Sequence, residues 1–344
     1  MLFCAAVGAI VAMPLSGRLC DRYASRHMTA LSGTLFGVAL GIASAAPAFG
    51  VVVPAAFVMG AGNGAMDVAM NVNGVALQAR AQRPIMSSLH GLFSVGTFVA
   101  AACMAELVAL RLPQIGASAA IAVLVAGASL ALRPLLTHDP ARRIPRAARA
   151  PRRVPRRLLL LGIAAICGAV SEGSLVEWSG VYVRESLHVG IAAALGGFAA
   201  YAVAMSLSRF GGDWVVRRSG PVALVRASGL LAVAGLAVAL IVHTYAAVVF
   251  GFFIAGLGLG NVSPLVYGAG GEAAETSAGT GVAVVTTLGY SGFLIGPAII
   301  GVTAQRASID VAFALVALFA LGIALLAPVL RERSAAAPVV ARRG

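Results

Sequence analysis

Ionisable side chains stand inside long apolar runs of this 344-residue sequence, where a charge is costly. The most informative are the acids Glu172 and Asp67. A charged group at the centre of a bilayer costs roughly 2.5–3.5 kcal/mol on insertion scales, so such residues should face water or a partner. Burial also favours the protonated form of a carboxylate. The pattern predicts groups that take up and release protons, with Glu172 as the first candidate and Asp67 as the second.

Two further ionisable residues extend this hypothesis. Glu177 lies five residues after Glu172, a rotation of about 140° on a helix, so the two acids cannot face one narrow cavity. His90 begins the next apolar run after Asp67, and an Asp–His pair would form a proton relay. The alternatives are acids satisfied by a neighbouring helix or by water, and a histidine solvated at the membrane surface.

Uncharged polar and aromatic residues accompany these groups. Four asparagines lie in the apolar runs: Asn63, Asn71, Asn73 and Asn261. Their carboxamides could bind a hydroxylated solute, or they could join one helix to another. Trp178 follows Glu177, where its ring would stack on a sugar or anchor the helix at the interface.

The elements that carry these residues must be membrane helices. The sequence is 60% hydrophobic and 11% charged, with a mean hydropathy of +0.95, whereas soluble proteins average about 25% charged residues. Only helices or closed barrels satisfy their backbone groups in lipid. The apolar runs predict an all-α polytopic protein with about eleven segments, near 1–20, 28–46, 49–76, 86–110, 115–137, 158–183, 189–211, 221–242, 244–269, 278–303 and 308–330.

The positive charge is distributed unevenly between the predicted loops. If the loop with Arg22 and Arg26 is cytoplasmic, almost every loop arginine falls on that side, and only Arg111, Arg184 and Arg306 fall outside. The C-terminus is then cytoplasmic. Eight arginines between positions 142 and 157 alternate with proline and alanine and lack aromatic residues. They favour a flexible linker anchored by charge over a nucleic-acid-binding segment.

The two halves of the chain repeat one another. Asp21 and Asp213 occupy similar charged segments 192 residues apart, and Asp67 corresponds to Asn261 at a separation of 194. The repeat predicts two related bundles. We expect an N-terminal bundle at 1–137, a basic linker at 138–157, a C-terminal six-helix bundle at 158–331 and a tail at 332–344.

The charged segment "SGRLCDRYASR", its weaker copy "SRFGGDWVVRR" and the long basic central loop together resemble the major facilitator superfamily. The stretches "GAGNGAMDVAMNVNGVALQARAQRPIMSSLHGLFSVG" and "SEGSLVEWSGVYV" resemble a bacterial inner-membrane branch distantly similar to sugar permeases. The resemblance implies twelve helices, so we expect the first helix to be absent from these 344 residues, with a start upstream of Met1 or a truncated product.

The resemblance also implies a role for the charged segments, which latch the two halves in that superfamily. The residues concerned are Gly17, Asp21, Arg22 and Arg26 in the first copy and Asp213, Arg217 and Arg218 in the second. The second copy departs from the pattern, because Arg209 replaces the leading glycine. The alternative is that these arginines only set topology.

These observations predict an inner-membrane secondary transporter that works by alternating access, and we expect it to be monomeric and coupled to protons. Its expected solute is a small metabolite, either sugar-like or of another class. No motif of an ATP-driven or hydrolytic enzyme is present, no cysteine pair suggests a metal site, and we expect no cofactor. The competing interpretation is a truncated, non-transporting remnant, or a scaffold or sensor.

Overall fold

The computed structural model describes the whole chain except residues 47, 112, 140–153, 274–275 and 332–344. The described residues form helices and turns without a strand, which confirms the all-α prediction. Most of the expected linker and the whole expected tail lie outside the described residues. The helices are α1 (Leu2–Tyr23), α2 (Ser25–Ala45), α3 (Phe49–Ala81), α4 (Met86–Ala109), α5 (Gln114–Ala131), η1 (Arg133–Leu135), α6 (Arg156–Leu187), α7 (Ile191–Val242), α8 (Tyr245–Leu259), α9 (Val262–Gly271), α10 (Ala278–Arg306), α11 (Ile309–Leu326) and η3 (Ala327–Leu330).

The described helices account for the eleven predicted crossings. Nine apolar helical spans are long enough to cross a membrane, and α5 is a shorter apolar helix. The 52-residue α7 makes two crossings, because Gly220 has a φ of 81° and Pro221 follows it. Helices α8 and α9 form one crossing that is broken at Gly260 and Asn261.

The largest difference between a predicted boundary and the structure is at the end of the seventh segment. The sequence ends the seventh segment at residue 211, but the first part of α7 remains helical until Gly220. The physical reason is that residues 212–219 contain no proline, and Gly220 is the first position with a non-helical backbone. Asp213, which the sequence places in a charged turn, therefore lies on a helix, and Arg209 lies well inside it.

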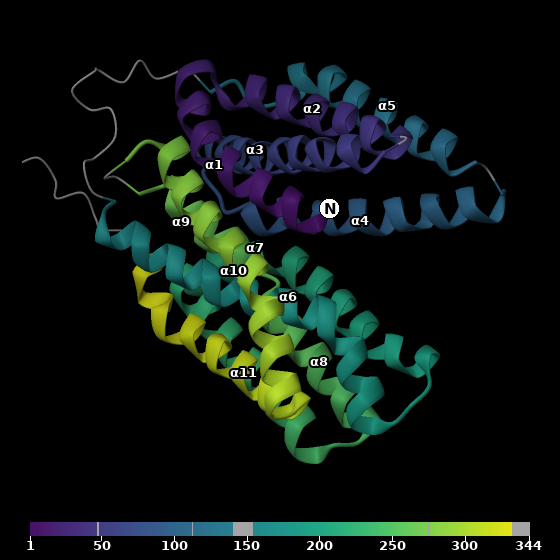
Figure 1. The fold of residues 1–344 in the computed structure, drawn as a ribbon. Helices are drawn as coiled ribbons and strands as arrows, with labels where there is room; N and C mark the ends of the chain where they lie inside the picture. Colours follow the sequence, from purple (N-terminus) through teal and green to yellow (C-terminus); the bar gives the residue numbers. More distant parts are fainter. Residues whose placement is uncertain (47, 112, 140–153, 274–275, 332–344) are drawn as a thin grey trace, which may run out of the picture.

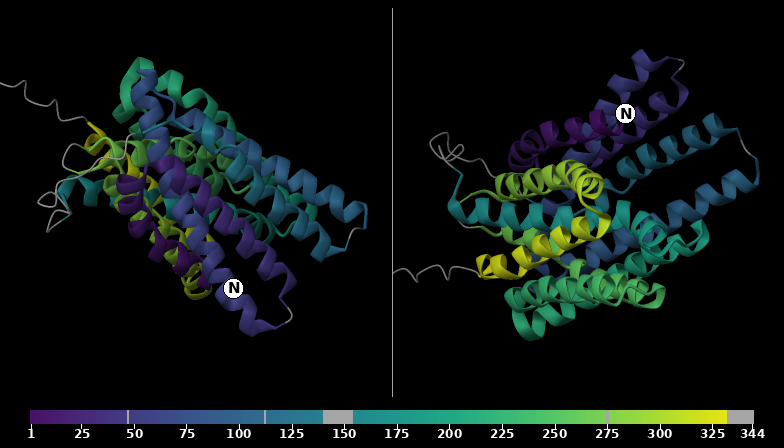
Figure 2. Two further views of the ribbon diagram at one scale, coloured as in Figure 1. Left: turned by 90° about the horizontal axis from the view of Figure 1, so that it is seen from above. Right: turned by 60° about the horizontal axis from the view of Figure 1, so that its bottom comes forward.

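The helices form two groups, α1–α5 and α6–α11 (Figure 1). The groups lie close together at one end and separate towards the other, and Figure 2 shows the same two groups from two further directions. We call the close end the arginine-rich end, because it carries Arg22, Arg26, Arg80, Arg83 and Arg217.

The two groups approach most closely where α1 crosses α10 at the arginine-rich end. Gly17 and Gly279 face one another there, and a Cβ atom added to either would overlap the other's carbonyl oxygen. Glycine lets helix backbones approach this closely in a membrane, where packing rather than hydrophobicity joins helices. This glycine crossing fixes the position of α10 relative to α1.

Candidate functional site

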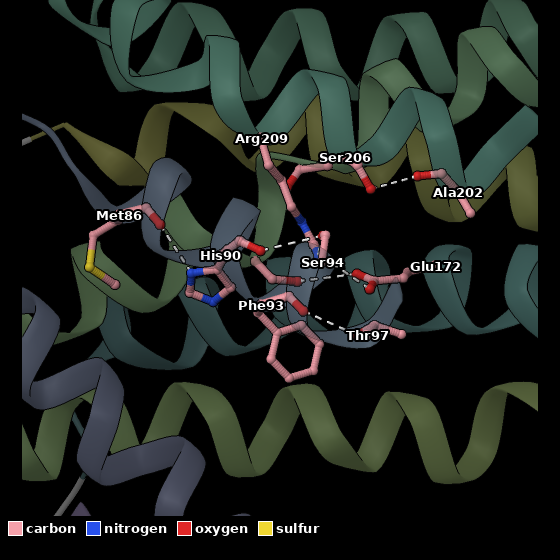
Figure 3. Close-up of polar contacts among 11 residues, drawn as sticks. Met86, His90, Phe93, Ser94, Thr97, Glu172, Ala202, Ser206 and Arg209 are labelled. Carbon is pink, nitrogen blue, oxygen red and sulfur yellow. Dashed lines mark hydrogen bonds and ion pairs between the residues drawn. The ribbon is translucent and has the colours of Figure 1, made fainter. Parts of the chain in front are cut away.

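An ion pair lies in the interior of the C-terminal group. The guanidinium Nη2 of Arg209 is 3.4 Å from Oε1 of Glu172 (Figure 3). Arg209 is on α7 and Glu172 is near the middle of α6, and both side chains are largely buried, at 7% and 16% exposure. A buried charge needs a partner of opposite charge, so each residue makes the other tolerable inside the protein.

Arg209 also bridges the two helix groups. Its Nη1 donates to Oγ of Ser94 on α4 at 2.9 Å, and its Nε donates to the carbonyl oxygen of Gly260 at 3.1 Å. Ser94 belongs to the N-terminal group, whereas Glu172 and Gly260 belong to the C-terminal group. Any motion that separates α4 from α7 must therefore break a hydrogen bond to the buried guanidinium.

The break between α8 and α9 supplies one of these partners. The helix stops at Gly260, which leaves its carbonyl oxygen free to accept from Arg209. Asn261 fixes the break, because its Nδ2 donates to the backbone oxygen and the Oγ of Ser208 at 2.9 and 2.7 Å. Ser208 in turn donates to the carbonyl oxygen of Leu257 at 2.6 Å. Discontinuous helices of this kind mark binding sites in many transporters.

Asp67 approaches this region from α3. Its Oδ1 accepts from Nδ2 of Asn71 at 3.3 Å, whereas its Oδ2 is buried and has no hydrogen-bond partner among the described residues. The nearby Tyr290 of α10 is hydrogen-bonded to the side chain of Asn63. An acid and two carboxamides of the N-terminal group thus lie beside an aromatic hydroxyl of the C-terminal group.

Ser263 and Tyr267 of α9 lie between the two acids. Ser263 donates to Oε2 of Glu172 at 3.5 Å and is also hydrogen-bonded to Tyr267. Both Asp67 and Glu172 act electrostatically on Tyr267. Polar residues of six helices, α3, α4, α6, α7, α9 and α10, therefore form one neighbourhood. We call it the central cluster: Asn63, Asp67, Asn71, His90, Ser94, Glu172, Arg209, Ser263, Tyr267 and Tyr290.

His90 is half-buried on α4 between these groups. Its Nδ1 lies 3.1 Å from the carbonyl oxygen of Met86, and its ring centre lies 6.4 Å from that of Tyr267. Within the described part of the chain, no hydrogen bond joins His90 to Asp67. The Asp–His relay therefore has both members close to Tyr267 but no direct contact between them.

Three other expected site residues lie apart from the cluster. The Glu177 side chain is exposed, consistent with the rotation that separates it from Glu172. The indole of Trp178 lies against Gly301 of α10, where it packs on the C-terminal core. Asn73 serves within the N-terminal group, since its amide bonds Ser25 and both backbone groups of Thr137.

A first carboxylate joins the two groups at the arginine-rich end. Asp21 of α1 accepts from the backbone N–H of Gly279 at 3.1 Å and from the hydroxyls of Ser277 and Thr280 at 2.5 and 3.4 Å. These residues form the N-terminus of α10. A carboxylate is stabilised there because the first N–H groups lack partners within the helix and the helix dipole is positive.

A second carboxylate repeats this contact with the halves exchanged. Asp213 of α7 accepts from the backbone N–H groups of Ser87 and Ser88 at 3.1 and 2.8 Å, at the N-terminus of α4. Asp21 and Asp213 are 192 residues apart, and so are Ser87 and Gly279. We call these two contacts the Asp21 latch and the Asp213 latch.

Two of the arginines near the latches lie over aromatic rings, and for two others no side-chain partner is seen among the described residues. The guanidinium of Arg22 lies 5.0 Å from the ring centre of Tyr23, and that of Arg218 lies 4.2 Å from that of Trp214. Nε of Arg26 is buried without a hydrogen-bond partner among the described residues, and Arg217 is exposed. The carboxylates, rather than the arginines, thus make the recorded contacts between the groups.

The sequence interpretation identifies Glu172 but misses Arg209, its partner in the ion pair, and the contacts of Arg209 with Ser94 and Gly260. It treated Arg209 as a departure from the glycine pattern, close to the end of a helix that was expected to stop at residue 211. The sequence does contain a signal for this pair: Arg209 lies within the seventh apolar run and Glu172 within the sixth, and opposite charges in neighbouring membrane helices can pair. Serines and tyrosines of the central cluster carried no such signal, since they are common in membrane helices. No group of metal-ligating side chains was found among the described residues.

Comparison with known families supports the resemblance that the motifs suggested. The model of the Major Facilitator Superfamily matches residues 1–297. Among curated proteins, an uncharacterised MFS-type transporter of Yersinia pestis is 33% identical over 94% of this chain and 84% of its own length. The membrane protein MosC of Rhizobium meliloti is 32% identical over 94% of this chain and 78% of its own length.

Solved structures with the same fold include sugar:proton symporters. A structure of the transporter FucP in the outward conformation has a TM-score of 0.79, with 15% identity over 96% of this chain and 88% of that chain. Another FucP structure is described as the fucose:proton symporter of E. coli. The proton:xylose symporter XylE has a TM-score of 0.72, with 13% identity over 94% of this chain and 83% of that chain.

Proposed function

This chain belongs to the Major Facilitator Superfamily, and on that premise we propose that it is a proton-coupled transporter of a small hydroxylated solute. It would work by alternating access, with the two helix groups rocking about the central cluster. The observation that carries the proposal is the Glu172–Arg209–Ser94 chain, because it links an acid that can bind a proton to a contact between the two halves.

The coupling step follows from the charges of this chain. When Glu172 is ionised, it neutralises Arg209 and helps to hold the guanidinium against Gly260 and Ser94. When Glu172 binds a proton, the attraction is lost, and Arg209 is free to turn towards other acceptors. The Ser94 bond then weakens, which favours separation of α4 from α7.

A hydroxylated solute fits the uncharged groups around the two acids. Asn63, Ser263 and Tyr267 offer donors and acceptors at the interface of the groups, and Asp67 has a carboxylate oxygen without a recorded partner. Such groups can exchange their present partners for sugar hydroxyls. The sugar substrates named for FucP and XylE are compatible with this class, although the low identities carry only the fold.

We propose that the arginine-rich end faces the cytoplasm of a bacterial inner membrane, as the excess of arginine in the loops favours. The described conformation then has its cytoplasmic end closed by the two latches and the glycine crossing, and its outer end open. The two bundles meet at the central cluster, where a solute arriving from outside would bind.

The test compares proton and solute movement in vesicles that contain the purified chain. Monosaccharides, starting with L-fucose and D-xylose, are added outside, and an internal pH-sensitive dye reports proton entry. For wild type we expect sugar-dependent acidification; for Glu172→Gln we expect exchange of labelled sugar without proton-driven accumulation. Glu185→Gln, an exposed acid at the end of the same helix, serves as the control.

The possible results separate the parts of the proposal. If wild type moves no sugar and no protons, the chain does not perform this transport. If Glu172→Gln accumulates sugar with the same pH dependence as wild type, Glu172 does not couple protons.

A further inference from the structure

An apolar groove opens at the junction of α3, α4 and α7, at the arginine-rich end. Its cavity volume is about 360 Å³. It is lined by Leu77, Ala81, Arg83, Ile85, Ser88, Leu89, Leu92 and Phe210. Leu77, Leu92 and Phe210 are exposed, so the groove opens onto an apolar part of the molecular surface, as expected where a membrane protein contacts acyl chains.

The positive charge near the groove comes from both halves of the molecule. Arg83, in the turn between α3 and α4, lines its rim and is exposed. On α7, Phe210, Trp214 and Arg217 lie at successive turns of one face, since these spacings keep side chains on one side of a helix. The exposed Trp214 also carries the guanidinium of Arg218 at 4.2 Å. Along this face of α7 the apolar groove at Phe210 is therefore followed by the ring of Trp214 and then by the cations Arg217 and Arg218.

This order matches the order of groups in a phospholipid that carries net negative charge. Acyl chains are apolar, interfacial aromatic rings lie at headgroup level, and basic residues at this level attract anionic headgroups. A sugar or a peptide would leave the leucines and Phe210 exposed to water or would bury polar groups against them.

We propose that the groove binds one anionic phospholipid. An acyl chain would lie between Leu89, Leu92 and Phe210, and the phosphate would lie between Arg83 and Arg217. The site is separate from the central cluster and does not depend on the solute that the chain transports.

The groove joins lipid binding to the closed state of the arginine-rich end. Its walls come from α4 and from α7, and Ser88 lines it while donating to Asp213 in the second latch. When α4 and α7 separate, the walls move apart and the two arginines no longer face one headgroup. A lipid that binds only the closed arrangement must favour that arrangement.

Native mass spectrometry of the full-length chain, released from nanodiscs, tests the site directly. The nanodiscs contain equal amounts of phosphatidylglycerol and phosphatidylcholine with the same acyl chains. We expect wild type to retain phosphatidylglycerol in preference to phosphatidylcholine. The double variant Arg83→Gln/Arg217→Gln should lose about 30-fold of that preference, as expected for two arginines near a membrane surface.

Two further variants locate the site. Arg184→Gln removes an exposed arginine from the opposite end and should keep the preference. Ala81→Phe fills the groove without changing charge and should reduce retention of both lipids, which also tests the proposal if the double variant does not fold. Equal retention of the two lipids by wild type, a preference that survives the double variant, or unchanged retention by Ala81→Phe would each overturn the proposal.

Discussion

Arg209 shows how a single buried cation can serve several helices at once. It has three recorded acceptors, on α4, on α6 and at the break between α8 and α9. Its pairing with Glu172 is long for a charge-assisted bond, which typically measures about 2.7–2.9 Å. A pair of this length is easier to exchange than a tightly closed one, which is compatible with the change of partners that we propose for Arg209.

The first prediction concerns this pair. Removing one member of a buried ion pair leaves the other without compensation and costs about 3–5 kcal/mol, whereas removing both costs less. We therefore expect Arg209→Gln to lower the thermal unfolding temperature in detergent strongly. The double variant Glu172→Gln/Arg209→Gln should recover part of that loss.

A double-mutant cycle provides the measurement, with unfolding followed by intrinsic fluorescence. Additive losses from the two single variants would mean that the charges do not interact in the folded protein.

At the scale of elements, the helix crossings determine which parts can move. The backbones of α1 and α10 touch at Gly17 and Gly279, so neither of these two positions has room for a side chain. The α4–α7 seam is built differently, with the Phe210 ring against Gly91 and an apolar groove beside it. The turn that leads from α1 into α2 is also constrained, because Ala24 has a φ of 70°, which a residue with a side chain rarely adopts.

The glycine crossing leads to a second prediction. In Gly17→Val the new side chain would overlap Gly279 and force α1 away from α10, which should weaken closure of the arginine-rich end. Gly127→Val on α5 is the matched control, because a Cβ there meets no atom within 4 Å among the described residues.

Closure is measured as the distance between spin labels on cysteines placed at Tyr23 and Ser219, in a variant without the four native cysteines. Gly17→Val should lengthen the mean distance and Gly127→Val should not. Similar distances in both variants would show that the crossing does not hold the end closed.

Parts of this arrangement can be read from the sequence, and the reasons differ between elements. The eleven crossings follow from apolar length, because lipid demands about 20 apolar residues for each helix. The 192-residue repeat places Asp21 and Asp213 in equivalent positions. A short acid next to a helix end can also be expected to pair with the N-terminus of another helix.

Other parts require the folded chain. The sequence does not reveal that α7 continues to Gly220, and this boundary decides whether Arg209 is at the surface or inside. Nor does it reveal the break at Gly260, because glycines are frequent in all these helices and only tertiary packing selects the one that opens. The sequence also leaves open whether Trp178 stacks on a sugar or anchors its helix at the interface, and in the folded chain its indole packs against Gly301.

At the scale of the whole molecule, two equivalent latches hold one end closed while the groups separate at the other (Figure 1). Each latch pairs a carboxylate of one half with a helix N-terminus of the opposite half. The energy of such a contact is modest, about 0.5–2 kcal/mol when the capping oxygen is removed, so the closed end is stable but can open.

The third prediction concerns these latches. Asp21→Asn and Asp213→Asn keep the shape of the side chain but remove its charge and one of its two accepting oxygens, and each should shift the equilibrium towards an open arginine-rich end by about 2- to 30-fold. Because the latches lie on separate seams, the double variant should show roughly the product of the two shifts.

The same pair of spin labels reports the populations of closed and open molecules. A double variant no more open than either single variant would show that the two contacts act as one unit rather than as independent ones.

Among the positions at which the halves differ is the one where Gly17 in the first half corresponds to Arg209 in the second, again 192 residues apart. A repeated architecture allows its two copies to specialise: the first has the smallest residue at this position and brings two helix backbones together, and the second has a cation that pairs with a buried acid. Exchanging the two residues would therefore not give an equivalent molecule, because it would put an arginine at position 17, where the backbone of Gly279 leaves no space for a side chain.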